Sequence, residues 1–116
     1  SLDGRRDWGY APDYTDAMWR MLQQPEPEDY VLATGAAHSI RDFLSAAFEA
    51  VELDWREYVE QDPRYMRPAE VTHLVGNASK AESKLGWKAA TTLNDLAVRM
   101  VRHDLQLYSN QARQNS

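Results

Sequence analysis

The sequence predicts a mixed α/β fold in which helices dominate, with three main helices and a few short strands. Three segments repeat apolar residues at the spacing of one helix face, whereas only short apolar runs have the composition of strands. No Gly-x-Gly-x-x-Gly sequence occurs, so the chain contains no Rossmann unit. Its 116 residues suffice for one small core, and we treat residues 1–116 as a single domain.

The first predicted helix begins at Pro12 and Asp13, because proline suits a first helical turn and an acidic residue there complements the helix dipole. It ends before Pro25. Its apolar face comprises Tyr14, Ala17, Met18, Met21 and Leu22. The apolar run that follows at residues 30–34, closed by Gly35, predicts a buried strand.

The second helix is predicted from Ser39 onward, with Ser39 and Asp42 in a capping box. Its apolar stripe comprises Ile40, Phe43, Leu44, Ala47, Phe48 and Val51. Residues 53–60 are ambiguous, but their aromatic and β-branched side chains favour a strand near Tyr58.

Two further helices are predicted near the end of the chain. Asn77 or Ser79 caps a short one, with Ser79 and Glu82 spaced as a capping box, and Gly86 ends it so that Trp87 packs back. Thr92 caps the last helix. Its buried face comprises Leu93, Leu96, Ala97, Met100, Val101 and Leu105. Residues 110–116 are polar, and we expect them to form a disordered tail.

Composition excludes several classes of function. The net charge of −5 argues against a nucleic-acid surface, and the absence of cysteine excludes disulfides and thiolate metal sites. No apolar run reaches membrane-spanning length, so we expect a cytoplasmic protein without a membrane partner. His38, His73 and His103 lack metal-ligand spacing, and we assign no metal site. The first residue is Ser rather than Met, and we expect further residues upstream of it.

The stretch with the strongest character of a binding site is the loop at residues 62–71, which contains two prolines. If Pro68 opens a helical turn, Arg67 and Glu70 can face one ligand, since they lie three residues apart. A guanidinium suits phosphate oxygens, and a carboxylate accepts hydrogen bonds from ribose hydroxyls. The spacing alone favours a surface turn that holds an ordinary Arg–Glu pair.

Four blocks of the sequence resemble the GDP-mannose 4,6-dehydratases, which belong to the extended short-chain dehydrogenase/reductase group that modifies nucleotide sugars. The blocks are GRRDWGY at residues 4–10, EPEDYVLATG at 26–35, DPRYMRPAEV at 62–71, and KA with KLGWK at 80–88. They occur in the order typical of the family. The chain resembles only the C-terminal third of such an enzyme, so the resemblance implies a C-terminal substrate-binding lobe.

The resemblance also implies roles for individual residues. Arg6 and Arg67 would hold the diphosphate of GDP-mannose, with Arg5 as the alternative to Arg6, and Glu70 would hold the ribose hydroxyls. The parent enzyme would use NADP to convert GDP-mannose to GDP-4-keto-6-deoxymannose. Its catalytic Tyr, Lys and Thr/Glu would lie in an N-terminal cofactor-binding domain of the same protein.

We therefore place no catalytic residue in this chain, and we expect that it binds no cofactor and has no activity alone. The family implies dimers or tetramers formed mainly through the other domain, and leaves the oligomeric state of this chain open. Two alternatives remain. The Arg-Asp-Trp and Leu-Gly-Trp blocks are shared with other nucleotide-sugar dehydratases, epimerases and reductases, and the amphipathic helices fit a non-catalytic α/β interaction module equally well.

Overall fold

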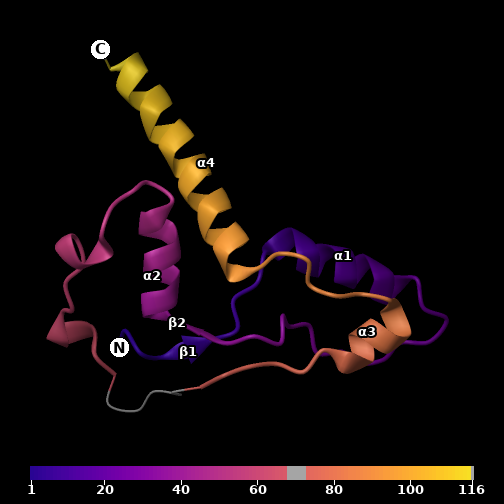
Figure 1. Ribbon diagram of the computed structural model, residues 1–116. Coiled ribbons are helices and arrows are strands. Elements are labelled where there is room, and N and C mark those ends of the chain that lie inside the picture. The colour runs from indigo at the N-terminus through magenta and orange to yellow at the C-terminus, as the bar shows by residue number, and fades with distance from the viewer. Residues whose placement is uncertain (68–72, 116) are drawn as a thin grey trace.

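The computed structural model describes residues 1–67 and 73–115. Helices account for most of the regular structure, and the strands of the described part form a two-stranded antiparallel sheet, so the helix-dominant prediction is confirmed (Figure 1). The elements in chain order are β1 (Arg5–Arg6), α1 (Ala11–Leu22), β2 (His38–Ser39), α2 (Ile40–Glu49), the 3-10 turns η1 (Trp55–Glu57) and η2 (Pro63–Tyr65), α3 (Ser79–Leu85) and α4 (Leu93–Gln114).

The best-buried core lies between α1 and α3. Ala17 of α1 and Ala81 of α3 are fully buried, and their small side chains let the two helices approach closely. Trp87, which follows α3, is only 2% exposed and fills the space beside them. Its indole nitrogen donates to the carbonyl of Asp13 in the first turn of α1, at 2.8 Å. Tryptophan therefore links the two helices through both its apolar ring and its polar N–H.

The end of α3 is fixed as the sequence predicts. Gly86 has φ of +63°, the left-handed conformation that glycine adopts without a steric penalty. The guanidinium of Arg20, on α1, donates to the carbonyls of Leu85 and Gly86 at 3.2 and 2.8 Å. These bonds satisfy carbonyl groups that a helix leaves unpaired at its C-terminus.

The second cluster joins α2 to the first half of α4 (Figure 1). The capping box of Ser39 and Asp42 is present at α2, and Thr92 caps α4 by accepting from the Asp95 amide at 3.2 Å. Leu93, Leu96 and Ala97 are buried, whereas the predicted stripe of α2 is only half-buried. Beyond Val101, α4 projects away from the other elements and is exposed.

Two strand predictions are wrong. Residues 30–34 form no strand, and the amide of Thr34 donates to the Asp7 carboxylate instead of a neighbouring strand. The segment near Tyr58 contains η1, because the carboxylate of Asp54 accepts from the Arg56 amide at 3.0 Å and nucleates a turn. The buried ring of Trp55 then donates to the Ser45 hydroxyl at 3.2 Å rather than packing along a strand.

Two details near the chain end also differ from expectation. The Ser79 side chain does not cap α3; Asn77 accepts from the Ser79 amide at 3.0 Å instead. Residues 110–114 are helical where a disordered tail is expected, since α4 continues to Gln114. That stretch holds no Gly or Pro, its Gln, Ala and Arg residues favour helix, and Arg113 complements the dipole at the helix end. Of the helices in the described part, none is both long and apolar enough to cross a membrane.

Candidate functional site

Arg6 lies on β1 and pairs with His38 of β2. It is half-buried, and its guanidinium donates to the carbonyl of Arg5 through Nη1 at 2.8 Å. The neighbouring guanidinium of Arg5 donates to the carbonyl of Ala37, also at 2.8 Å, and so holds β1 against the residue before β2. Both arginines therefore donate hydrogen bonds to backbone carbonyls, and the bond from Arg5 joins two segments of the chain.

The carboxylate of Asp7 is the centre of a hydrogen-bond network that joins three distant parts of the chain. Its Oδ1 accepts from both the amide and the hydroxyl of Thr34. Its Oδ2 accepts from the amides of Gly35 at 2.9 Å and Gly76 at 3.2 Å. We call these four residues the Asp7 network. It fixes the residue next to Arg6 against both the loop at residues 34–35 and the segment that follows His73.

The charge of Asp7 is stabilised by this network. Partial burial raises the pKa of the Asp7 carboxyl, but the hydrogen bonds from Thr34, Gly35 and Gly76 outweigh burial and leave the pKa below its ordinary value. The carboxylate is thus ionised at neutral pH and is used to organise the backbone. Sequence reasoning did not single out Asp7. No local feature of the sequence marks this residue, because the amides that it binds belong to residues 34, 35 and 76.

Arg67 lies on a loop that is held by local contacts. Pro63 opens η2, and the carboxylate of Asp62 caps it by accepting from the Arg64 amide at 2.9 Å. The Arg64 guanidinium folds back on Asp62, with Nη2 to Oδ2 at 2.7 Å, and this hydrogen bond lowers the pKa of the Asp62 carboxyl. Arg67 itself is exposed.

Glu70 lies outside the described residues, so its position relative to Arg67 stays a prediction. The structure does limit the distance between Arg67 and Arg6. His73 forms a parallel bridge with Arg5, and six residue steps separate it from Arg67. A fully extended chain of that length spans at most about 22 Å. The loop that carries Arg67 is therefore tethered to the strand that carries Arg6.

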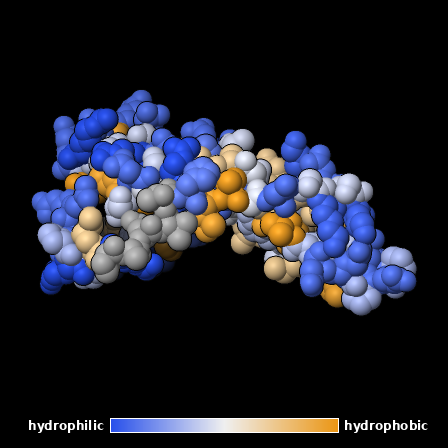
Figure 2. Space-filling model, turned by 90° about the horizontal axis from the view of Figure 1, so that it is seen from below, coloured by the Kyte–Doolittle hydropathy of each residue, from blue (hydrophilic) through white to orange (hydrophobic). Residues whose placement is uncertain are grey.

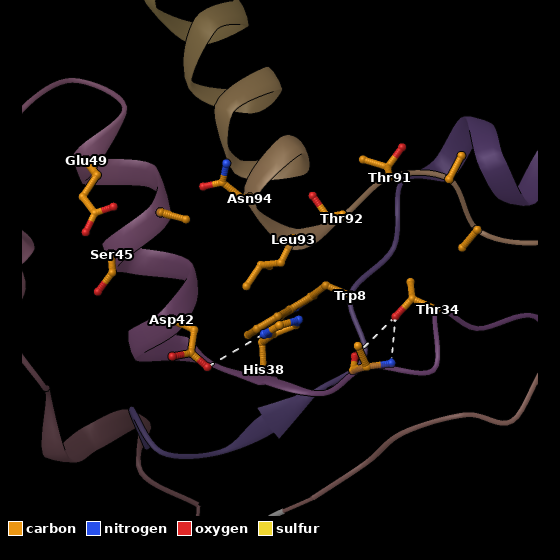
Figure 3. A pocket seen from close by; sticks show the side chains of 14 residues that line it. Trp8, Thr34, His38, Asp42, Ser45, Glu49, Thr91, Thr92, Leu93 and Asn94 are labelled. Atoms are coloured by element: carbon orange, nitrogen blue, oxygen red, sulfur yellow. Dashed lines mark hydrogen bonds and ion pairs between the residues drawn. The ribbon is translucent and has the colours of Figure 1, made fainter.

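A groove of about 590 Å³ lies between α2 and the first turn of α4 (Figure 3). Trp8 and His38 lie at its centre, and side chains that include Asp42 and Glu49 come from α2. Neither Arg6 nor Arg67 lines it, and its described lining residues include no Lys or Arg. Because the described lining includes two acidic residues and no cationic one, this groove is poorly suited to a diphosphate.

In the part of the chain that the structure describes, no three His, Asp or Glu side chains lie close enough together to hold a metal ion. The Nδ1 of His38 lies 4.0 Å from Oδ2 of the Asp42 carboxylate.

Comparison with known proteins identifies close relatives of the chain. The family model described as GDP-mannose 4,6 dehydratase matches residues 1–100. GDP-mannose 4,6 dehydratase 2 of Arabidopsis thaliana is 50% identical over 107 residues, which cover 92% of this chain and 29% of that protein. The Homo sapiens GDP-mannose 4,6 dehydratase is 40% identical over 124 residues, covering 92% of this chain and 33% of that protein. The chain thus spans about a third of the length of these relatives.

Solved structures with the same fold have lower sequence identity. RMD of Pseudomonas aeruginosa, complexed with NADPH, superposes with a TM-score of 0.76 at 22% identity, over 88% of this chain and 33% of that one. UDP-glucose 4-epimerase of Thermotoga maritima, complexed with UDP-glucose, also gives 0.76, at 19% identity over 93% of this chain and 34% of that one. At these identities the likeness supports the fold alone.

Proposed function

The chain belongs to the GDP-mannose 4,6-dehydratase family, and on that premise we propose that it supplies the GDP-sugar-binding part of an enzyme that converts GDP-mannose to GDP-4-keto-6-deoxymannose. The observation that supports this proposal is the family match over residues 1–100, which includes Arg6, Arg67 and Glu70. The bridge between His73 and Arg5 sets an upper limit on the distance from Arg67 to β1, and this limit is compatible with a ligand shared by Arg67 and Arg6.

In this proposal the two arginines bind the diphosphate and Glu70 binds the ribose hydroxyls. A guanidinium stays charged at any physiological pH and can donate two parallel hydrogen bonds to phosphate oxygens. The half-buried Arg6, next to the fixed carboxylate of Asp7, would be the preorganised contact. The exposed Arg67 would complete the site. Binding energy gathered on the nucleotide, far from the reacting carbons, would position the sugar for reaction.

The same proposal assigns the chemistry to a cofactor-binding domain of the same enzyme. The 116 residues contain neither a glycine-rich dinucleotide motif nor a Tyr-x-x-x-Lys pair, so we assign no catalytic residue to them. NADP bound by the other domain would accept hydride from C4 of the sugar and return it to C6 after water is lost. The chain alone is then expected to bind GDP-sugars weakly and to catalyse nothing.

Calorimetry with GDP, dTDP and UDP tests the nucleotide assignment. GDP should bind most tightly. Replacing Arg67 with alanine should remove about 1.5–3 kcal/mol for each charged hydrogen bond lost, or roughly a 10- to 150-fold loss of affinity. Arg64→Ala is a matched control, because Arg64 is an exposed arginine on the same loop that is already paired with Asp62. It should leave the affinity for GDP unchanged.

Two results would contradict the proposal. Tighter binding of dTDP than of GDP would assign the chain to another class of nucleotide-sugar enzyme. Equal effects of Arg67→Ala and Arg64→Ala would show that Arg67 does not contact the ligand and contributes only general positive charge. Arg6→Ala, measured in the same way, tests whether both arginines act on one diphosphate.

A further inference from the structure

The loop that carries Arg67 is preceded by a segment with one large buried side chain. Figure 2 shows a face of the molecule where hydrophilic residues predominate and hydrophobic ones form small separate patches. Trp55, twelve residues before Arg67, is nevertheless only 7% exposed. Because a tryptophan buries more area than any other residue, its burial fixes the backbone that carries it.

Trp55 is held by one face of α2 and by two arginines. Its indole Nε1 donates to the Ser45 hydroxyl at 3.2 Å. The guanidinium of Arg41, one helical turn before Ser45, lies over the ring at 5.8 Å from its centroid, and that of Arg56 lies over it at 5.2 Å. Both distances are within the range of a cation–π interaction. The indole is thus bound through both its N–H and its ring.

The attachment to α2 continues beyond Trp55. The ring of Tyr58 stacks on that of Phe48, with 5.8 Å between the centroids and 24° between the planes. The amides of Tyr58 and Val59 both donate to the Trp55 carbonyl, at 3.0 and 3.1 Å. These contacts fix the chain against α2 as far as residue 59, eight residues before Arg67.

Arg41 connects this anchor to the beginning of the chain. Its Nε donates to Oδ1 of Asp3 at 2.7 Å, and its amide donates to the carbonyl of Leu2 at 3.2 Å. Leu2 and Asp3 lie directly before β1, the strand that carries Arg6. One side chain of α2 therefore contacts both Trp55 and the approach to β1.

The Arg67 loop is thus attached on both sides to the same N-terminal segment. On the far side, His73 bridges Arg5 of β1. On the near side, Trp55 is linked through α2 to the residues directly before β1. The internal shape of η2 comes from its own proline and cap, but its place relative to β1 depends on where the chain enters and leaves the loop.

We propose that Trp55 is a positioning residue, which fixes the entry of the Arg67 loop relative to β1 and so holds Arg67 and Arg6 in place before a diphosphate binds. This inference rests on the proposed function, in which both arginines bind one diphosphate. A binding group that occupies its productive position for only part of the time lowers the apparent affinity by that fraction. Trp55 touches no ligand and acts through Arg67.

Calorimetry with GDP tests the effect on binding. Trp55→Leu keeps an apolar side chain at the buried site but removes the ring that the arginines cover. It should lower the affinity for GDP about 10-fold, which corresponds to a loop in its productive position about a tenth of the time. Trp55→Phe restores a ring and should recover most of this loss.

Leu96→Ala is the matched control for a general loss of stability. Leu96 is 8% exposed and lies on α4, the helix that packs on α2. The cavity should lower the melting temperature of the chain. At a temperature where the variant is folded, its affinity for GDP should equal that of the wild type, because the contacts of Trp55 are intact.

The position of the loop can also be measured without a ligand. Because the chain has no cysteine, Gln61→Cys and Ala36→Cys place two spin labels at exposed positions, one at the entry of the loop and one just before β2. Double electron–electron resonance should give a narrow distance distribution that broadens with Trp55→Leu and narrows again with Trp55→Phe. Should Trp55→Leu not fold, Arg41→Gln removes the contacts to Trp55 and Asp3 from an exposed position and should broaden the distribution as well.

Three results would overturn the inference. These are an unchanged distance distribution in the variant that lacks the ring or the Arg41 contacts, a loss of GDP affinity that Trp55→Phe does not recover, and an equal loss in Leu96→Ala. If the wild-type chain bound no GDP, the proposed function would fail, whereas the spin-label distances would still decide whether Trp55 fixes the loop. If the wild type binds GDP but the Trp55 variants bind it equally well, only the positioning role is refuted.

Discussion

The Asp7 network and the loop at residues 62–67 both come from sequence blocks typical of the family, yet they are stabilised in opposite ways. Asp7 accepts hydrogen bonds from residues that lie 27, 28 and 69 positions further along the chain. In the loop, Asp62 is bonded to Arg64, two positions away, and both the Arg64 and Arg67 side chains are exposed. One block thus holds the domain together, and the other is free to contact a ligand.

This difference separates two roles that a sequence block can have, one in the fold and one in binding. The Arg-Asp-Trp block has a structural acidic residue beside a proposed binding arginine, so the position of Arg6 depends on the fold of the whole domain. The Pro-Arg-Tyr turn keeps its shape through its own proline and cap, so its shape depends little on the rest of the chain. Substitutions in the two regions should therefore separate stability from binding.

The largest effect is expected for Asp7→Ala. It removes the charged acceptor of three backbone amides and one hydroxyl, and leaves partly buried donors without a partner. We expect a loss of about 3 kcal/mol in the free energy of unfolding, measured by urea denaturation. Asp7→Asn, which keeps the shape and one acceptor oxygen, should lose less. A loss for Asp7→Ala no greater than that for substitutions in the loop would contradict the contrast between the two regions.

Glycine substitutions within the Asp7 network should give the next largest effect. An alanine at Gly76 would place its Cβ 2.3 Å from that of Ala33, and the backbone has to move to relieve the clash. We expect a loss of about 1–3 kcal/mol. Gly35 meets nothing within 4 Å but has φ of +82°, so Gly35→Ala should cost about 1–2 kcal/mol through strain alone. Thermal melting of both variants distinguishes crowding from strain, because only the crowded site should be rescued by Ala33→Gly.

The pH dependence of stability offers a smaller test of the same network. The pKa of Asp7 is lower when folded than its ordinary value of 3.8, so its stabilising contribution is complete above that value and is lost as the pH falls through the folded pKa. Other carboxylates also titrate there, and the quantity to measure is the wild-type unfolding free energy minus that of Asp7→Asn. This difference should shrink on acidification below pH 3.8. A difference that stays constant would show that Asp7 contributes without its charge.

Features governed by neighbouring residues could be predicted from the sequence. The caps at Ser39 and Thr92 and the left-handed glycine at Gly86 follow from interactions that span only a few residues, and all three are confirmed. The packing of Trp87 follows from the same motif, since the chain turns back at Gly86. Local chemistry therefore predicted most of the helical framework.

Features that depend on distant partners could not be predicted. Residues 30–34 have the composition of a strand, but strand formation requires a neighbour, and the described chain provides none. Asp7 is one of many acidic residues, and nothing in its local sequence reveals that amides at residues 34, 35 and 76 converge on it. For the site itself, the sequence named Arg6 and Arg67, while their common ligand stays a prediction.

The smallest effect is expected at the Asp62–Arg64 pair. Arg64→Ala breaks a hydrogen-bonded ion pair whose charges are both in contact with solvent, where water and salt replace most of the lost interaction. The urea midpoint should remain within experimental scatter of the wild type at 0.15 M salt. Asp62→Ala also removes the cap of η2 and should shift the local hydrogen exchange of Arg64 and Tyr65 without changing global unfolding. If either variant destabilised the chain as much as Asp7→Ala, the loop would have to be part of the core structure, and the exposure of Arg67 would no longer favour binding over a structural role.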